Sequence, residues 1–437
     1  MSDSTPTSHL INIKKEIASS YPDFEERVTR AWADILDEMK KVTQNISAGG
    51  PEFIPQVQFS ELQSLPADQI DKIRCKGCLV IRNIIDDSQA ITWKKSLEDF
   101  VSANPDADAC RFPDGDKQFF RLYWTKPQLE ARAHPNMLAA SVWLNNLYHA
   151  EPGQKLEGVD LNSPLTYADC FRFRHPGSDG RWTAVLPPHV DGGTIERWED
   201  PTLRSCFADI FSGQWRKHDP FALAGRVGAQ NSLYGRPMQS SIFRAFQGWL
   251  ALSETAPTEG TLQVFPNVLL SNAYLILRPF FRLLVEPDSQ EVSNPKSWAF
   301  DVSSADFPGL IPRNGGWYGP RPTPELHPNL LLEETMTSMP KVFPGDAVFW
   351  HGDVIHSVEK EHTGKYDSAV MYIPAVPTTP LNQVYIERQK ESFLKAVTPP
   401  DFPVPTKHEN ALVGFGKPGD ILNPLGRKAM GLSVSVV

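Results

Sequence analysis

A histidine and an aspartate stand two positions apart in "LPPHVDGGTIERW", as His189 and Asp191. On an extended chain these positions share one face, so an imidazole and a carboxylate can reach the same ion. A third candidate ligand follows in "PGDAVFWHGDVIHSVEKEH", which supplies His351, His356 and His362. Two histidines and one carboxylate form a facial triad, which leaves adjacent positions of a six-coordinate Fe(II) open. The pattern therefore indicates a metal site.

The choice of the third ligand stays open at this point. A histidine and an aspartate at this spacing often form only a polar turn, so the pair needs a partner from another strand. We expect His362 to lie in a solvated loop, whereas His351, at the end of a neighbouring strand, could exchange roles with His356.

Several strands must position these ligands. "LTYADCFRFRHP" alternates between two faces, and further strands are expected in "SSIFRAFQGWLALS", "GTLQVFP", "GDAVFWH" and "SAVMYIPA". No long helices alternate with them, and 39 prolines favour many ordered loops. The pattern favours an antiparallel barrel or sandwich wrapped by helices over a parallel sheet.

Helices are expected before this region. Apolar residues recur at helical spacing within residues 10–46, with Pro22 as a break, and "SLPADQIDKIRCKGCLVIRNIIDDSQAITWKKSLEDFV" indicates helix, strand, turn and helix. Cys75 and Cys78 lie in this second segment. Because a buried strand follows at once and no second CxxC exists, we interpret them as structural residues rather than a zinc or redox pair.

The composition restricts the partners. The chain has 43 basic and 52 acidic residues, a net charge of -9, and no basic stripe that could follow phosphates. We expect no nucleic-acid partner. The N-terminus lacks the features of a secretory signal, and "NAYLILRPFFRLLV" is too short and too charged to span a bilayer. A cytoplasmic protein without a membrane span that binds a small molecule is expected, and its oligomeric state is left open.

Four segments together resemble the Fe(II)/2-oxoglutarate dioxygenase superfamily, in particular its phytanoyl-CoA hydroxylase-like branch. They are "LPADQIDKIRCKGCLVIRNIIDD", "HVDGG", "GWLALSETAPTEGTLQVFP" and "PGDAVFWHGDVIHSV", which recur in order from about residue 60 to 375. "FRAFQGWLALS", "HVDGGTIERW" and "YIPAVP" resemble, more narrowly, a microbial and fungal family of this type without a generally assigned substrate.

The resemblance implies a fold, a metal and co-substrates. His189, Asp191 and His356 would bind Fe(II), and 2-oxoglutarate and O2 would be consumed to oxidise a substrate, with release of succinate and CO2. The implied fold is mainly β with flanking helices (α+β), with a double-stranded β-helix (jelly-roll, cupin-like) core. Asp191 and His356 are 165 positions apart, longer than usual for the superfamily, so insertions are expected at 192–238 and 268–340.

The same resemblance suggests three parts of the chain. Residues 1–110 would form a helical region and an opening strand packed on the core. Residues 111–380 would form the dioxygenase core with its insertions, and residues 381–437 a C-terminal helix and an extended tail.

The anchor for the distal carboxylate of 2-oxoglutarate departs from the superfamily pattern. Many members carry an Arg ten residues after the distal histidine and a Ser two further on, where this chain has Tyr366 and Ser368. A buried carboxylate still needs a charged or multiply donating partner. We predict Arg244 in this role, unless it pairs with a structural carboxylate such as Glu254 or Glu259. The further candidates are Ser368, Lys365 and Gln247.

The substrate is specified only weakly. Arg172 and Arg174 share one strand face and suit a carboxylate or a phosphate, although either could face solvent. Tyr123 and Trp124 belong to a cluster with Gln128 and Arg132 that could line a pocket or simply pack. These residues favour a small, polar metabolite that carries a carboxylate.

Two other classes of protein fit the same residues. A cupin-like, metal-dependent sugar-binding protein or isomerase would share the jelly roll without oxygen chemistry. A metal-free scaffold would share only the fold.

Overall fold

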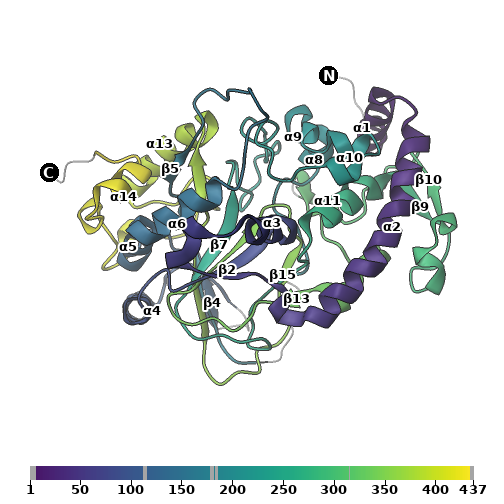
Figure 1. Ribbon diagram of the computed structural model, residues 1–437. Coiled ribbons are helices and arrows are strands. Elements are labelled where there is room, and N and C mark those ends of the chain that lie inside the picture. The colour runs from purple at the N-terminus through teal and green to yellow at the C-terminus, as the bar shows by residue number, and fades with distance from the viewer. Residues whose placement is uncertain (1–5, 112–115, 178–181, 183–185, 314, 434–437) are drawn as a thin grey trace.

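An eight-stranded sheet forms the centre of the protein in a computed structural model that describes residues 6–111, 116–177, 182, 186–313 and 315–433 (Figure 1). Its neighbouring strands are antiparallel except for the first pair, which is parallel. The strands, in spatial order, are β1 (Gln56–Gln58), β2 (Cys78–Arg82), β14 (Ala347–His351), β7 (Phe246–Ala251), β16 (Ser368–Tyr372), β6 (Phe171–Arg174), β4 (Lys117–Phe120) and β3 (Ala109–Arg111).

A smaller, three-stranded antiparallel sheet carries one of the candidate ligands. It consists of β13 (Thr337–Ser338), β8 (Leu262–Val264) and β15 (His356–Val358), so His356 is the first residue of its strand. Three two-stranded pairs complete the strands: β5 (Asp160–Leu165) with β17 (Val376–Thr378), β9 (Phe281–Leu283) with β10 (Trp298–Phe300), and β11 (Ile311–Arg313) with β12 (Gly316–Tyr318).

The protein is thus a mixture of helices and mostly antiparallel sheets, as the sequence predicts in outline. Within the described residues, the strands belong to separate sheets and hydrogen bonds do not close them into one barrel. The jelly-roll core stays a prediction.

Helices surround the sheets. Those before β5 are α1 (Pro6–Ser20), α2 (Phe24–Gly49), α3 (Ala67–Lys76), α4 (Asp87–Ala103), α5 (Lys126–Ala133) and α6 (Pro135–Asn145). Those after β6 are α8 (Glu196–Glu199), α9 (Pro201–Ser205), α10 (Ala208–Phe211), α11 (Val268–Leu277), α12 (Leu332–Thr335), α13 (Pro380–Lys395) and α14 (Pro424–Ala429). In the described part of the chain, no helix combines the length and the apolar character needed to cross a membrane.

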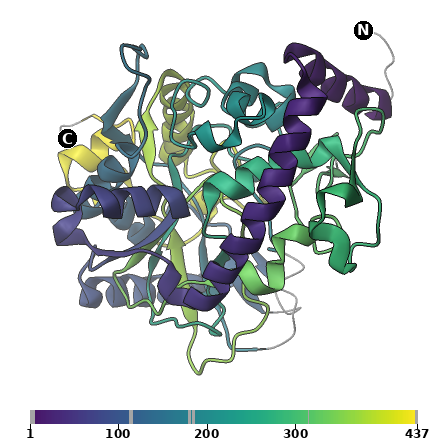
Figure 2. The ribbon, with the colours of Figure 1, turned by 45° about the vertical axis from the view of Figure 1, so that its right-hand side comes forward.

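The long helix α2 packs across α11, as the two views show (Figures 1 and 2). The break expected at Pro22 is real: α1 ends at Ser20, and Asp23 adopts a left-handed conformation with φ 51° before α2 begins. The buried stripe of α2 includes Trp32, whose ring stacks on Tyr274 at 5.0 Å and on Phe281 at 4.7 Å between centroids. Aromatic stacking thus attaches this helix to the segment that follows β8.

The segment with the two cysteines forms the predicted helix, strand and helix as α3, β2 and α4. Cys78 is fully buried on β2, where burial raises the pKa of its thiol to about 12, whereas Cys75 is exposed on α3. Both thiols are free. Burial keeps the Cys78 thiol protonated at neutral pH, which agrees with a structural role.

The two segments expected to be insertions differ in content. Residues 192–238 contain the short helices α8, α9 and α10, and residues 268–340 contain α11, two strand pairs, α12 and β13. Loops from both segments reach the cavity described below. They are therefore placed where they can influence what binds there.

Candidate metal centre

Two histidines from distant parts of the chain are joined through their backbones. The amide of His189 donates to the carbonyl of His356, and the amide of His356 donates to the carbonyl of His189, each at 2.9 Å. This isolated antiparallel bridge places the HxD segment beside β15. The two imidazole rings consequently lie together, with centroids 4.2 Å apart.

Both imidazoles present the same nitrogen to the site. Nδ1 of His189 lies 2.6 Å from the carbonyl oxygen of Pro187, and Nδ1 of His356 lies 3.0 Å from that of Val354. A carbonyl oxygen only accepts, so each Nδ1 carries the proton and each Nε2 keeps its lone pair. These free Nε2 atoms lie 3.6 Å and 3.3 Å from the Asp191 carboxylate.

The electrostatics of the three groups suit a cation. Burial, and after it the neighbouring His356, lowers the pKa of His189 to about 4, so its imidazole is neutral at neutral pH. Burial alone would raise the pKa of the Asp191 carboxyl, but attraction to the adjacent imidazole of His189 holds this pKa well below its usual range. Candidate ligand atoms of His189, Asp191 and His356 lie within 4.8 Å of one another. The neutral imidazole of His189 and the ionised carboxylate of Asp191 are in the states in which these groups bind metals.

The large sheet holds the carboxylate of Asp191 in place. Gln247 on β7 and Trp350 on β14 are partners across the two strands. With the amide oriented to satisfy both neighbours, Gln247 Nε2 donates to Asp191 Oδ2 at 2.9 Å, and its Oε1 accepts from Trp350 Nε1 at 3.2 Å. Such outer partners orient a metal ligand, so Gln247 can position Asp191. Gln247 also lines the adjoining cavity, and its contact with a co-substrate stays a prediction.

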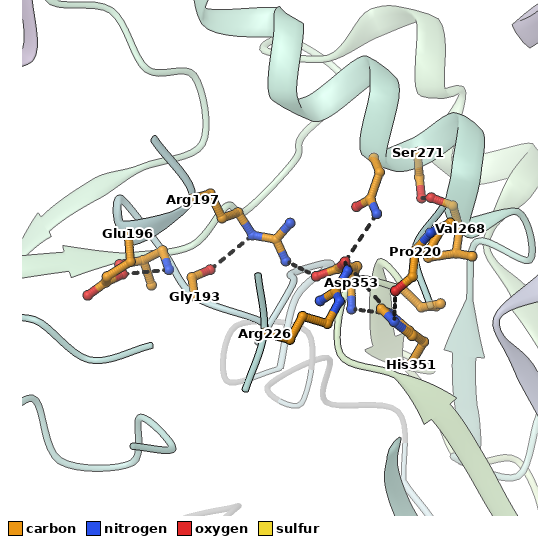
Figure 3. A network of polar contacts seen from close by, with 12 residues as sticks. Gly193, Glu196, Arg197, Pro220, Arg226, Val268, Ser271, His351 and Asp353 are labelled. Atoms are coloured by element: carbon orange, nitrogen blue, oxygen red, sulfur yellow. Dashed lines mark hydrogen bonds and ion pairs between the residues drawn. The ribbon is translucent and has the colours of Figure 1, made fainter. Parts of the chain in front are cut away.

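Asp353 is the centre of a buried polar cluster, and its neighbours Arg197, Arg226 and His351 are drawn with it in Figure 3. Arg197 and Arg226 donate to the two carboxylate oxygens of Asp353 at 2.7 Å and 2.6 Å, and Asn272 donates to the second oxygen at 3.1 Å. Asp353 is completely buried. Gly192 is the residue after Asp191. A Cβ atom at this position would come within 2.6 Å of Oδ1 of Asp353. The cluster therefore requires glycine beside the candidate ligand.

His351 belongs to this buried cluster and not to the metal site. Its Nδ1 accepts from the amide of Asp353 at 3.0 Å, so the proton is on Nε2, which donates to the carbonyl of Pro220 at 3.0 Å. Burial lowers its pKa to about 3, and its ring stacks on Tyr148 at 5.5 Å. Since both ring nitrogens are occupied, the geometry favours His356 over His351 as the third ligand.

His362 is placed differently from the prediction. It is buried rather than solvated, and its backbone pairs with Gly177 and Glu259. The sequence cannot reveal this because the two partner segments lie far away along the chain. It is not among the residues that line the cavity at the candidate metal site.

A cavity of about 260 Å³ opens onto the candidate metal ligands. The large sheet supplies Arg172, Gln247, Trp249, Trp350 and Tyr372 to its lining, and the small sheet supplies Leu262, His356, Ser357 and Val358. This volume is close to the lower end of small-molecule sites, which is roughly 300 Å³. The cavity can accept a metabolite but not a folded partner.

Two of the predicted arginines reach this cavity. Arg172 on β6 lines it, is only 2% exposed, and donates to the carbonyl of Gly260 at 3.4 Å while its Nε has no partner. Arg244 also lines it, but lies 4.0 Å from Asp169, neither of the two carboxylates considered from the sequence. Burial raises the pKa of Asp169 to about 6 against the lowering effect of Arg244.

Three predicted residues do not line the cavity. Lys365 is exposed, and its ammonium lies over the ring of Tyr366 at 5.1 Å. Ser368 is buried on β16 within 3.2 Å of the Thr255 hydroxyl. Arg174, its neighbour across the strands, donates to the carbonyls of Gly260 and Lys360. Lys365 lies in an exposed turn before β16, so its side chain is solvated and is not directed by the strand.

Tyr123 and Trp124 are packing residues and not part of the cavity lining. Tyr123 packs on Phe402 with centroids 4.6 Å apart, and Trp124 donates to the carbonyl of Val397 at 2.7 Å. Their neighbours Gln128 and Arg132 bond to nearby backbone carbonyls. An aromatic cluster looks alike in sequence whether it lines a cavity or fills a core, so composition could not separate the two.

Two lining arginines were missed by the sequence analysis. Arg236 lies in "YGRP" and Arg321 in "YGPRP", and both line the cavity together with His189. The sequence signal that could have pointed to them is a shared pattern. A Tyr-Gly pair followed closely by Arg-Pro occurs once in each expected insertion. Where such loops point is decided by the fold and not by local pattern.

Known proteins resemble this chain over nearly its whole length. A family model described as Gig2-like matches residues 6–432. The uncharacterised protein YbiU of Escherichia coli (strain K12) is 29% identical over 99% of this chain and 99% of its own length. The crystal structure of Gig2, a GlcNAc-inducible DUF1479 protein of Candida albicans, is 32% identical, covers 97% of this chain and 89% of its own, and has a TM-score of 0.84. A Salmonella typhimurium LT2 structure, described as a candidate oxidoreductase, is 27% identical over 99% of both chains, with a TM-score of 0.79.

Proposed function

This chain belongs to the Gig2-like family, and we propose that it is a non-haem Fe(II)- and 2-oxoglutarate-dependent oxygenase acting on a small organic anion. One observation carries the proposal: the Nε2 atoms of His189 and His356 converge with the Asp191 carboxylate, while both Nδ1 protons are engaged by carbonyls. A 2-His-1-carboxylate donor set with fixed tautomers fits Fe(II) and leaves positions open for small ligands.

The proposed reaction balances as substrate–H, 2-oxoglutarate and O2 giving substrate–OH, succinate and CO2. Bound Fe(II) would supply the oxygen chemistry. The chain itself has three tasks. His189, Asp191 and His356 hold the ion, Gln247 orients Asp191, and the aromatic walls of the cavity limit access of water.

The relation between the two sheets supports the proposed double-stranded β-helix. Both sheets contribute side chains to one cavity, and the ligand-bearing segment pairs with β15 of the smaller sheet. That is the arrangement expected when a ligand site lies at the open end of a jelly roll. In this proposal residues 111–380 form the core, with 192–238 and 268–340 inserted, between an N-terminal part (1–110) and a C-terminal part (381–437).

Arg172 is the residue that we assign to the distal carboxylate of 2-oxoglutarate. The sequence favours Arg244, but that guanidinium has Asp169 as an acidic neighbour. Arg172 has no ion pair within the described residues, although it is buried and faces the cavity from β6. A buried cation without an acid is unfavourable until an anion binds, so Arg172 is the better anchor. A cupin-like isomerase would not need a site for the distal carboxylate of 2-oxoglutarate.

Anaerobic addition of Fe(II) and 2-oxoglutarate tests the proposal directly. A visible charge-transfer band should develop, and succinate should form when air is admitted. A folded protein that shows neither the band nor succinate would favour a cupin-like protein or a metal-free scaffold.

The localisation of the protein in the cytoplasm remains a prediction of the sequence.

Replacing Arg172 with alanine should weaken 2-oxoglutarate binding at least about tenfold, the scale of one charged hydrogen-bonded contact. The affinity is measured by titrating the charge-transfer band, which does not depend on turnover. Arg244→Ala is the matched control and should change the affinity much less, because Arg244 is shared with Asp169. The opposite order of the two effects would return the anchor to Arg244.

A further inference from the structure

Two loops from distant parts of the chain bring arginines together beside the cavity. Arg236 lies in the loop before β7, and Arg321 follows β12. Their guanidinium carbons lie 3.3 Å and 5.4 Å from the centre of the Tyr318 ring, and all three residues line the cavity. A third arginine, Arg313, lies 5.1 Å from the same ring but does not line the cavity.

The described part of the chain supplies no acidic partner for these arginines. Within the described ranges, no carboxylate lies within ion-pair distance of Arg236, Arg313 or Arg321. Arg236 donates to the carbonyl of Trp317, and its buried Nε has no hydrogen-bond partner. This is unexpected in a chain with a net charge of -9, where acidic residues are plentiful.

The positive charges of these arginines repel one another. Burial is the largest effect that lowers the pKa of Arg236, and repulsion from Arg321 and Arg313 lowers it further, while Tyr318 and Glu196 act in the opposite direction. Like charges held together beside a cavity attract an anion and gain from its binding. The face of Tyr318 holds the guanidiniums in place by cation–π contact.

We propose that Arg236 and Arg321 form a subsite for the carboxylate or phosphate group of the substrate. The assignment of this anion as the substrate rests on the proposed function, whereas the binding of an anion does not. Guanidinium groups suit both acids because their paired N–H donors match two oxygens.

The subsite is separate from the anchor assigned to 2-oxoglutarate. Arg172 lies on β6 of the large sheet, whereas Arg236 and Arg321 lie on loops of the two segments expected to be insertions. Arg321 acts electrostatically on His189, so the subsite adjoins the metal ligands. An acid group held there would leave the remainder of the molecule to extend past the metal site.

The rest of the cavity restricts that remainder. Trp249, Tyr372 and Phe402 line it with aromatic surface, and its volume is about 260 Å³. The structure therefore assigns a substrate class: a small organic acid or phosphate ester whose oxidised C–H bond lies away from the acid group, on an apolar or ring-containing portion.

Calorimetric titration of the metal-free protein with inorganic phosphate and with acetate, at low ionic strength, tests the subsite. The wild type should bind at least one of the two anions, and Arg236→Ala and Arg321→Gln should each weaken binding at least about tenfold. Arg313→Ala is the matched control and should weaken binding much less, because Arg313 does not line the cavity. Repeating the series in the Arg172→Ala protein removes any contribution from the inner anchor. Binding of phosphate alone would indicate a phosphate ester, and binding of acetate a carboxylic acid.

The outcomes separate this inference from the proposed function. If the wild type binds neither anion at millimolar concentrations, or if both variants bind as well as Arg313→Ala, the subsite is wrong even where the charge-transfer band forms. If anion binding depends on Arg236 and Arg321 but no band forms with Fe(II) and 2-oxoglutarate, the subsite stands and the oxygenase proposal fails. Arg321→Gln serves as the second variant should Arg236→Ala disturb β12, where the carbonyl of Trp317 accepts from Arg236.

Discussion

Replacing His356 with alanine is expected to abolish both stoichiometric Fe(II) binding and turnover. The variant removes one of the two imidazole Nε2 atoms that face Asp191. The loss of affinity should exceed the roughly 10–100-fold effect that is typical of losing only an outer partner of a metal ligand. Iron content after dialysis and the charge-transfer titration measure the two effects. His189→Ala and Asp191→Ala should behave in the same way.

His351→Asn is the control for this prediction. His351 is equally a strand-end histidine, but both its ring nitrogens are bonded within the buried cluster. The substitution should lower the stability of the protein while iron still binds to the folded fraction. A folded His356→Ala protein that keeps its iron, together with a His351→Asn protein that loses it, would show that the ligands have been exchanged.

Asp353→Ala is expected to lower the free energy of unfolding by about 3–5 kcal/mol, the range for removing one partner of a buried ion pair. The variant would leave the guanidiniums of Arg197 and Arg226 buried without their shared carboxylate. Chemical denaturation followed by fluorescence measures the change. Asp99→Ala, which removes an exposed carboxylate paired with Lys95 on α4, should leave the midpoint close to that of the wild type.

Asp353→Ala should also weaken the binding of iron at the candidate metal site. The amide of Gly192 donates to the carbonyl of Gly352 at 2.9 Å, so the turn that follows Asp191 is attached to the turn that contains Asp353. Iron affinity should therefore fall in the folded Asp353→Ala protein, although no ligand is removed. An Asp353→Ala protein as stable as Asp99→Ala, with full iron affinity, would contradict the role given to this cluster.

The candidate metal site could be predicted from the sequence because its candidate ligands have a local signature. A histidine and an aspartate two residues apart, followed by two glycines, could be recognised without knowing the fold, and the structure brings His356 to them. The packing around Asp353 also explains one of those glycines. The buried strand at Cys78 and the break between α1 and α2 followed from equally local patterns.

The lining of the surrounding cavity was harder to predict from the sequence, because the positions of the lining residues depend on long-range contacts. Tyr123 and Trp124 pack against the C-terminal region, whereas Arg236 and Arg321 meet on Tyr318 through two separate loops. The order of strands in the large sheet is also non-local: β7 lies between β14 and β16. Local hydrophobic period does not specify these pairings.

The backbone bridge between His189 and His356 has a consequence for the order of assembly. These residues are joined by two amide hydrogen bonds although residues 190–355 separate them in the chain. Such a contact forms only after a long loop has closed, so the ligand pair cannot exist early in folding. Once formed, it is held by the main chain and does not need an ion to keep it together. Iron is therefore expected to enter a chain that is already folded, and the rate of loading should depend on access through the cavity rather than on synthesis or refolding.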